Sequence, residues 1–279
     1  MKTQIDIRCS KNTAEKIAGQ IRLWAKDIIE SLTERAPPDR LKIFVYHGLD
    51  ELQNFFRKEK EALGIVSEGE AEFIAIHEAW RGYPRIHICS ERIKNLPEAV
   101  VLGAVQHELA HAVLHGRAEF YNFRFSRQLI SASEALGFDM QLLQQCVYML
   151  SIALKDGEVV SRLVEIGFQY GQIALLEHML ADTRCEHEVW RTIRHLPPQR
   201  KIAVASFLKI LLPVVILAAM SVDAGRRLQQ EWKNVYDWLS ETERLDMMHF
   251  ATGSVLDSTG SFQDRLEQTA LKLITDPRL

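Results

Sequence analysis

Cysteine is scarce in this chain of 279 residues, which contains four, all far apart and none in a Cys-X-X-Cys pair: Cys9, Cys89, Cys146 and Cys185. A chain of this length buries enough apolar surface to fold without disulfide bonds. We therefore expect reduced thiols and a cytoplasmic protein. The N-terminal segment also lacks the apolar run of a signal peptide, so secretion by that route is not expected.

An excess of charge of one sign is also absent. Lys and Arg together number 34, Asp and Glu number 37, and the formal net charge is −3. The chain has no block of Lys or Arg that would attract nucleic acid or an anionic membrane surface. We therefore expect no nucleic-acid partner. With 47% hydrophobic and 25% charged residues, the composition is that of an ordinary globular protein.

One hydrophobic run, Ile202 to Val222, approaches the length of a membrane span. Lys209 and Pro213 interrupt it, and the uncharged part from Ile210 onward has 13 residues. That length is more typical of a buried core helix than of a span. A Lys near the centre of a span also costs about 2.5–3.5 kcal/mol on insertion scales. We expect a buried helix, with membrane association as the less favoured alternative.

The hydrophobic pattern predicts a small mixed part followed by a long helical part. Apolar spacing of three and four residues indicates helices, and alternation of apolar with polar residues indicates strands. The elements expected in the mixed part are a helix over 12–35, a strand over 41–46, a helix over 49–63 and a β-hairpin of 72–80 with 85–90. The predicted fold class is therefore α+β and predominantly α-helical.

From residue 95 onward the pattern is helical throughout. Asn95 is expected to cap the first of these helices and Gly116 to end it. Gly157 is expected to separate two helices, because glycine punctuates helical patterns. The later helices are expected over 125–136, 140–154, 157–169, 171–182, 186–196, 199–222, 224–239, 241–252 and 261–275, with the buried run after Ala203 at the centre of a C-terminal bundle.

Residues 107–111 of the first helix read HELAH, which is the HExxH pattern. Residues four apart lie about 40° apart around a helix, so the imidazoles of His107 and His111 can reach one ion. Glu108 is placed to take a proton from a water on that ion. The helix is otherwise almost wholly apolar, and buried polar side chains need partners, which a metal supplies. The motif predicts one zinc ion per chain, with His107 and His111 as ligands and Glu108 as the base.

The segment HELAHAVLHG, preceded by a hairpin and followed by helices, resembles the active-site helix of the zincin metallopeptidases. The resemblance covers roughly residues 41 to 170. It implies a zincin-like region over 1–183, followed by a helical region over 184–279. It also implies that an edge strand, 72–80 or 85–90, holds extended substrate by backbone pairing.

The third zinc ligand separates the zincin subgroups. The metzincin pattern places it ten residues after His107, where this chain has Arg117, which does not ligate zinc. His115 lies two turns beyond His107 and about 80° around the helix, too far away to join the same site. We expect His115 to end the helix, where the negative C-terminal dipole favours it.

The gluzincin pattern instead implies a Glu on a later helix, and Glu158 is the ligand that we expect. It is predicted to begin a helix whose apolar stripe packs inward. Asp156 is the second choice, and Glu165 and Glu119 remain open. Gluzincins often carry a further acid four residues after this ligand, where this chain has Arg162.

These expectations together predict a zinc metallopeptidase that hydrolyses peptide bonds through a zinc-bound water activated by Glu108. The expected substrate is a peptide or protein. The residue types able to donate to the developing oxyanion include Tyr148, Arg162, Tyr170, His178 and His187. The alternative is a catalytically inactive zincin-like regulatory or scaffolding protein that binds a protein partner through its helical region. Glu108 argues for catalysis, because a structural zinc site needs no base.

Overall fold

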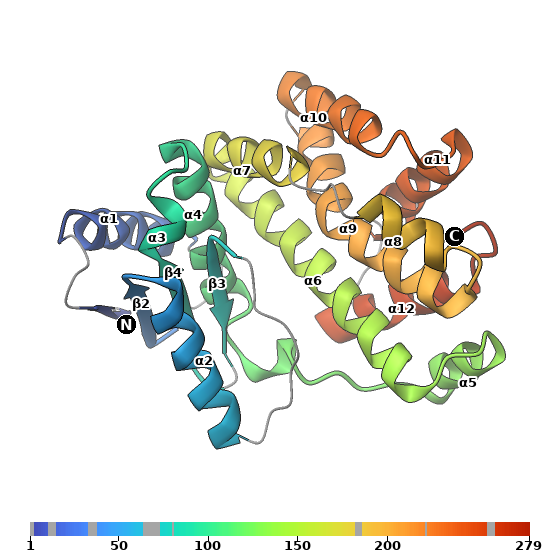
Figure 1. The fold of residues 1–279 in the computed structure, drawn as a ribbon, viewed down its shortest axis with the longest axis horizontal. Helices are drawn as coiled ribbons and strands as arrows, with labels where there is room; N and C mark the ends of the chain where they lie inside the picture. The colour runs from blue at the N-terminus through green and yellow to red at the C-terminus, as the bar shows by residue number, and fades with distance from the viewer. Residues whose placement is uncertain are drawn as a thin grey trace. The chain divides into compact units, whose positions relative to one another are not determined.

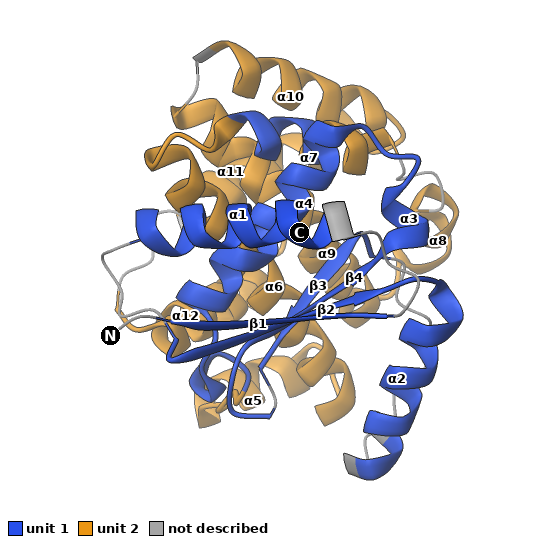
Figure 2. Ribbon diagram, turned by 90° about the vertical axis from the view of Figure 1, so that its left-hand side faces the viewer, with its two compact units in different colours: residues 1–121, 170–175 blue, residues 122–169, 176–279 orange. Residues whose placement is uncertain are grey.

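The computed structural model describes residues 3–10, 15–32, 38–63, 73–79, 81–181, 186–220, 222–255 and 260–279. The protein is 71% helical with a small mixed sheet of four strands, which confirms the predicted α+β, mainly helical class. It divides into two compact units: unit 1 is residues 1–121 with 170–175, and unit 2 is residues 122–169 with 176–279 (Figures 1 and 2). The functional division into 1–183 and 184–279 stays a prediction.

Unit 1 contains the sheet, whose strand order is β1-β2-β4-β3. The strands are β1 (Gln4–Cys9), β2 (Arg40–Tyr46), β3 (Ala75–Glu78) and β4 (Arg85–Cys89). β1 and β4 run parallel to β2, whereas β3 runs antiparallel to β4 and forms one edge of the sheet. The β3–β4 pair confirms the predicted hairpin. β1 was not among the predicted strands.

Helices cover both faces of this sheet (Figure 2). The helices that lie wholly in unit 1 are α1 (Glu15–Ser31), α2 (Leu49–Leu63), α3 (Ser90–Ile93) and α4 (Glu98–Leu114), followed by a 3-10 turn (Ala118–Phe120). Unit 1 also contains Tyr170–Leu175, the first part of α7 (Gln169–Ala181). Successive strand residues point to opposite faces. The paired Ile43 and Ile86 therefore line the face toward α1 and α4, and the paired Phe44 and His87 line the face toward α2, where both contact Phe55.

Helix α4 contains the HExxH motif, and its start differs from the prediction. Pro97 occupies the N-cap, and no side chain caps the helix. The expectation that Asn95 caps α4 is wrong, because Asn95 lies in the turn that follows α3. Pro97 suits the start of a helix because the first backbone N–H groups have no partner within the helix, and proline lacks that group.

Unit 2 is helical in the residues that the structure describes. Its helices are α5 (Arg127–Ala135), α6 (Met140–Glu165), the second part of α7 (Gln169–Ala181), α8 (Glu186–Ile193), α9 (Pro197–Met220), α10 (Val222–Val235), α11 (Glu241–Phe250) and α12 (Phe262–Thr275), with a π-helical turn at Ala251–Val255. α9 packs against α6 and α10, and Leu228 and Trp232 of α10 are fully buried. The apolar run after Ala203 is therefore the centre of a helical bundle, as predicted.

The predicted break between two helices at Gly157 is wrong. The two helices expected over 140–154 and 157–169 are one helix, Met140–Glu165. A Cβ on Gly157 would lie 2.9 Å from Leu212 and 3.1 Å from Ile216, both on α9. The glycine therefore permits the close approach of α6 and α9 rather than ending a helix.

Among the described helices, α9 alone is long and apolar enough to cross a membrane by length and composition, and 67% of its most apolar window of 18 residues is buried inside the protein. The core helix of a soluble protein passes the same test of length and composition. Membrane association and cytoplasmic location therefore both stay predictions from the sequence.

Candidate metal centre

Helix α4 brings the two histidines of the HExxH motif together on one face. Nε2 of His107 lies 3.1 Å from Nε2 of His111, and the ring centroids are 4.8 Å apart. Two nitrogens that bind one zinc ion at about 2.0–2.1 Å in tetrahedral geometry lie about 3.3 Å apart. His111 is buried and His107 and Glu108 are half-buried. The spacing and burial of the two Nε2 atoms match those of a metal-binding pair.

Gln172 orients the ring of His107. It lies in the first turn of α7, in the part of that helix that belongs to unit 1. The amide Nε2 of Gln172 donates to the backbone oxygen of Gly103 at 3.0 Å, so its Oε1 faces Nδ1 of His107, also at 3.0 Å. Because Oε1 is only an acceptor, Nδ1 of His107 must carry the hydrogen. The lone pair of the neutral ring is then on Nε2, the atom that faces His111.

Two glycines allow α7 to approach α4 at this point. A Cβ on Gly103 would lie 2.0 Å from the backbone oxygen of Gly171, and a Cβ on Gly171 would lie 2.9 Å from Cα of Gly103. Real side chains do not tolerate such contacts, so both positions require glycine. The close contact of the two backbones places Gln172 beside His107.

His115 ends α4, as predicted, but it also makes a contact with the motif. It is fully buried, and its Nδ1 lies 3.0 Å from Nδ1 of His111. This contact is on the side of the His111 ring opposite Nε2. His115 therefore contacts a different ring nitrogen of His111 from the one that faces His107.

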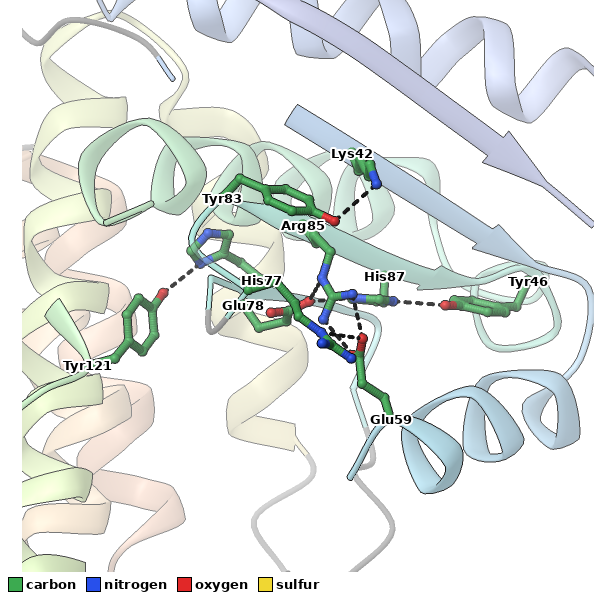
Figure 3. A network of polar contacts seen from close by, with 10 residues as sticks. Lys42, Tyr46, Glu59, His77, Glu78, Tyr83, Arg85, His87 and Tyr121 are labelled. Atoms are coloured by element: carbon green, nitrogen blue, oxygen red, sulfur yellow. Dashed lines mark hydrogen bonds and ion pairs between the residues drawn. The ribbon is translucent and has the colours of Figure 1, made fainter. Parts of the chain in front are cut away.

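The edge strand β3 contributes a third histidine to the surroundings of His111. His77 pairs with Ile86 in the sheet and therefore lies on the face toward α4. Its ring is nearly parallel to that of His111, with centroids 6.0 Å apart, and its Nδ1 lies 3.0 Å from the hydroxyl of Tyr121 (Figure 3). The sequence pattern did not single out His77 or Tyr121 as possible donors near the motif.

The sheet topology decides which predicted strand is available to an extended peptide. The resemblance left both 72–80 and 85–90 open. β4 is hydrogen-bonded to β2 on one side and to β3 on the other, so it has no edge to offer. β3 is at the edge of the sheet in the described part of the chain. Of the two strands, β3 is the one that fits the role.

A buried ionic network fixes β3 from the face opposite His77 (Figure 3). Glu78 of β3 forms an ion pair with Arg85 of β4, and Arg85 also binds Glu59 of α2 with an Nη1–Oε1 distance of 2.8 Å. All three side chains are at most 9% exposed.

Burial lowers the pKa of His87 despite its hydrogen bond to Glu78. Neutral His87 therefore donates Nε2–H to Glu78 and accepts from the hydroxyl of Tyr46.

Glu158, the predicted third ligand, belongs to unit 2. It lies in the middle of α6 rather than at the start of a helix, because α6 continues through Gly157. Its Oε2 accepts from Nη2 of Arg265 at 2.8 Å, and its side chain is 13% exposed. Arg265 therefore favours the ionised carboxylate that a metal ligand must be, and competes for one of its two oxygens.

The alternatives to Glu158 lie in different surroundings. Asp156 is half-buried on α6. Glu165 forms an ion pair with Arg162, with an Oε2–Nη1 distance of 2.6 Å. Glu119 is exposed in the 3-10 turn after α4.

The predicted oxyanion donors are distributed over both units. Tyr170 of unit 1 is 70% exposed, and the other four, Tyr148, Arg162, His178 and His187, belong to unit 2. The ring of His187 stacks on Trp238, with centroids 5.2 Å apart. Residue type alone did not identify His77, whose ring stacks on that of His111 in unit 1, or its hydrogen-bond partner Tyr121. A partial signal was available, since the alternation of β3 places His77 on one face and Glu78 on the other.

Comparisons with family models, with curated proteins and with solved structures find no match to this chain.

Proposed function

We propose that this protein is a zinc-dependent metallopeptidase that hydrolyses peptide bonds. The observation that carries the proposal is the 3.1 Å separation of the Nε2 atoms of His107 and His111, together with the orientation of His107 by Gln172. Two ring nitrogens whose lone pairs face each other away from water are costly unless they bind a cation or share a hydrogen. Neutral imidazole nitrogens are ligands that zinc prefers.

Glu108 is the proposed general base. It follows His107 directly on α4 and is half-buried, and under this proposal its carboxylate acts beside the two nitrogens. Zinc held there supplies a Lewis acid and brings the pKa of a bound water toward 7. The carboxylate of Glu108 accepts a proton from the attacking water and can later return it to the leaving amine. A zinc site that is only structural would have no use for this carboxylate.

Glu158 stays the proposed third ligand, with Asp156 as the alternative. A ligating carboxylate is normally held by a further hydrogen bond, and Arg265 provides one to Oε2 of Glu158.

Substrate is proposed to lie along β3. An edge strand can pair with an extended peptide through its backbone, and β3 is an edge strand next to α4. His77 of the same strand lies beside His111, and its hydrogen bond with Tyr121 leaves the pair one hydrogen to donate. These features support a zincin-like peptidase and give the proposal its substrate class, a peptide or protein in extended conformation.

The test compares the wild-type chain with Glu108→Gln, both loaded with zinc, on a peptide library read by mass spectrometry. Replacing the base should lower cleavage by about 10²-fold or more, since a general base contributes about that much. Zinc content should be unchanged, because Glu108 is not a ligand. Equal cleavage by the variant would contradict the mechanism. Zinc-loaded wild type that cleaves nothing would favour the inactive, partner-binding alternative.

A further inference from the structure

We propose that His115 is the positioning residue of the metal centre. When the ion is bound, His115 accepts the Nδ1 hydrogen of His111 and so directs Nε2 of His111 at the ion. The inference rests on the proposed metal site and assigns His115 a role that neither the HExxH motif nor the expected ligand set includes.

The position of His115 is fixed by contacts on several sides. Its backbone N–H donates to the backbone oxygen of His111 at 2.7 Å, which closes the last turn of α4. Its ring is fully buried and meets Phe120 edge-on, with centroids 4.9 Å apart and an angle of 71° between the planes. The Nδ1–Nδ1 distance of 3.0 Å to His111 is therefore set by backbone and packing together.

The hydrogens of the metal-free site follow from Gln172. Because Gln172 requires a hydrogen on Nδ1 of His107, Nε2 of neutral His107 is an acceptor. If His111 is also neutral, its Nε2, at 3.1 Å, donates to Nε2 of His107 and its Nδ1 accepts. The hydrogen of the His111–His115 bond therefore comes from Nδ1 of His115.

Binding of an ion reverses this arrangement. Both Nε2 atoms must then offer lone pairs to the ion, so the hydrogen of His111 is on Nδ1, where it is donated to Nδ1 of His115. His115 exchanges its Nδ1–H for an Nε2–H. Each of the two rings keeps one hydrogen, so no proton is gained or lost, and no bond between heavy atoms changes. The tautomer of His115 thus depends on whether the ion is bound, although His115 is not itself a ligand.

Because the partner of His111 is a histidine and not a carboxylate, it adds no negative charge beside the ligand. Partners of metal-bound histidines are often carboxylates, which add a negative charge behind the ligand. His115 accepts with a neutral nitrogen. An asparagine side chain places its Oδ1 near the position of the histidine Nδ1, so His115→Asn keeps an acceptor there, whereas His115→Phe keeps an aromatic ring without one.

The first experiment records the ring nitrogens of the histidines by ¹⁵N NMR in the metal-free and zinc-loaded wild-type chain. On loading, Nδ1 of His115 should change from protonated to unprotonated, while Nδ1 of His107 stays protonated in both states. An His115 ring whose tautomer is the same with and without zinc would overturn the proposal. This measurement needs no variant and no turnover.

The second experiment measures zinc affinity by competition with a chelating dye. His115→Phe should bind zinc about 10–100-fold more weakly, the usual effect of removing a ligand's hydrogen-bond partner. His115→Asn should recover most of that loss. Two variants that both bind zinc as tightly as the wild type would overturn the role of His115 and leave the proposed peptidase intact. A wild-type chain that binds no zinc would overturn both.

Discussion

Oε1 of Gln172 accepts the Nδ1 hydrogen of His107 at 3.0 Å, and the same amide cannot turn over because its Nε2 donates to the backbone of Gly103. One fully buried side chain thus fixes the tautomer of the first histidine of the motif. The metal-binding lone pair of His107 is set before any ion arrives.

Replacing Gln172 by Leu should weaken zinc binding about 10–100-fold, because the ring of His107 loses the group that fixes its tautomer. Gln172→Glu keeps an acceptor at Oε1 and should bind more tightly than Gln172→Leu. Gln20→Leu, a change of the same kind at a residue whose amide contacts Glu98, provides the control. Dye competition measures all three. If Gln172→Leu binds zinc as tightly as the wild type, Gln172 does not orient His107 for metal binding.

The contact between Gly103 and Gly171 predicts a steric effect. In Gly103→Ala the added Cβ would lie 2.0 Å from the oxygen of Gly171, so α4 and α7 must separate and carry Gln172 away from His107. We expect a loss of about 1–3 kcal/mol in the free energy of unfolding, the usual effect of overpacking, together with weaker zinc binding. Urea unfolding and a zinc titration measure the two effects.

Gly19→Ala provides the matched control for that substitution. Gly19 also lies in a helix of unit 1, but nothing lies within 4 Å of the position that a Cβ would take there. Alanine there should stabilise the protein by up to about 1 kcal/mol, because alanine favours helix more than glycine does. If Gly103→Ala behaves like Gly19→Ala, the close contact of the two helices does not position Gln172.

The network beneath β3 predicts an acid-sensitive contribution to stability. Burial raises the pKa of Glu59, but its hydrogen bonds to Arg85 and Arg81 and their charges outweigh burial and hold that pKa below its ordinary value of 4.5. Between the lowered pKa of the folded chain and the ordinary pKa of the unfolded chain, the unfolded chain binds more protons at Glu59. The stabilisation by ionised Glu59 is therefore complete above the ordinary pKa, and it is lost as the pH falls through the lowered pKa.

Glu59→Gln should therefore lose about 1.5–3 kcal/mol of unfolding free energy at neutral pH, the typical value of a hydrogen bond to a charged group. Its stability should also fall less steeply than that of the wild type below pH 4.5. Glu61→Gln, at a side chain 62% exposed on the same helix, should change little. Urea unfolding from pH 3 to pH 7 makes the comparison. If the free energy of unfolding falls equally steeply below pH 4.5 in the wild type and in Glu59→Gln, Glu59 is not the source of this acid sensitivity.

The third ligand is open to a direct comparison of variants. Glu158→Ala should lower zinc affinity by about tenfold or more, whereas Arg265→Met should have a smaller effect, since it removes only the partner of the carboxylate. Asp156→Ala is the alternative. If Asp156→Ala loses zinc and Glu158→Ala does not, Asp156 replaces Glu158 as ligand. If Glu158→Ala and Arg265→Met lower only the stability of the chain, the ion pair is structural.

The sequence predicted those parts of the molecule that depend on residues close together in the chain. The apolar spacing located most of the helices, alternation located the β3–β4 hairpin, and four-residue spacing placed His107 and His111 on one face of α4. Gly157 misled the prediction because glycine ends helices in isolation, whereas here it permits contact with Leu212 of α9. β1 could have been predicted, since polar and apolar residues alternate from Gln4 to Cys9; only its pairing with β2 could not be predicted from this pattern.

The groups that orient the motif could not have been read from the sequence. Gln172 lies 65 positions beyond His107, and nothing in a glutamine followed by apolar residues indicates that contact. His77 lies on a strand whose pairing with β4 decides which face it occupies. His115 was visible as the end of a helix, but its bond to His111 depends on ring orientations that packing against Phe120 fixes.

The central claim is that His107 and His111 hold a metal ion, and zinc analysis of the chain purified without a histidine tag tests it most directly. The account predicts about one zinc ion per chain, lost in His111→Ala and kept in His249→Ala, a change at an exposed histidine of unit 2. A wild-type chain that holds no zinc and takes up none when zinc is added would contradict it.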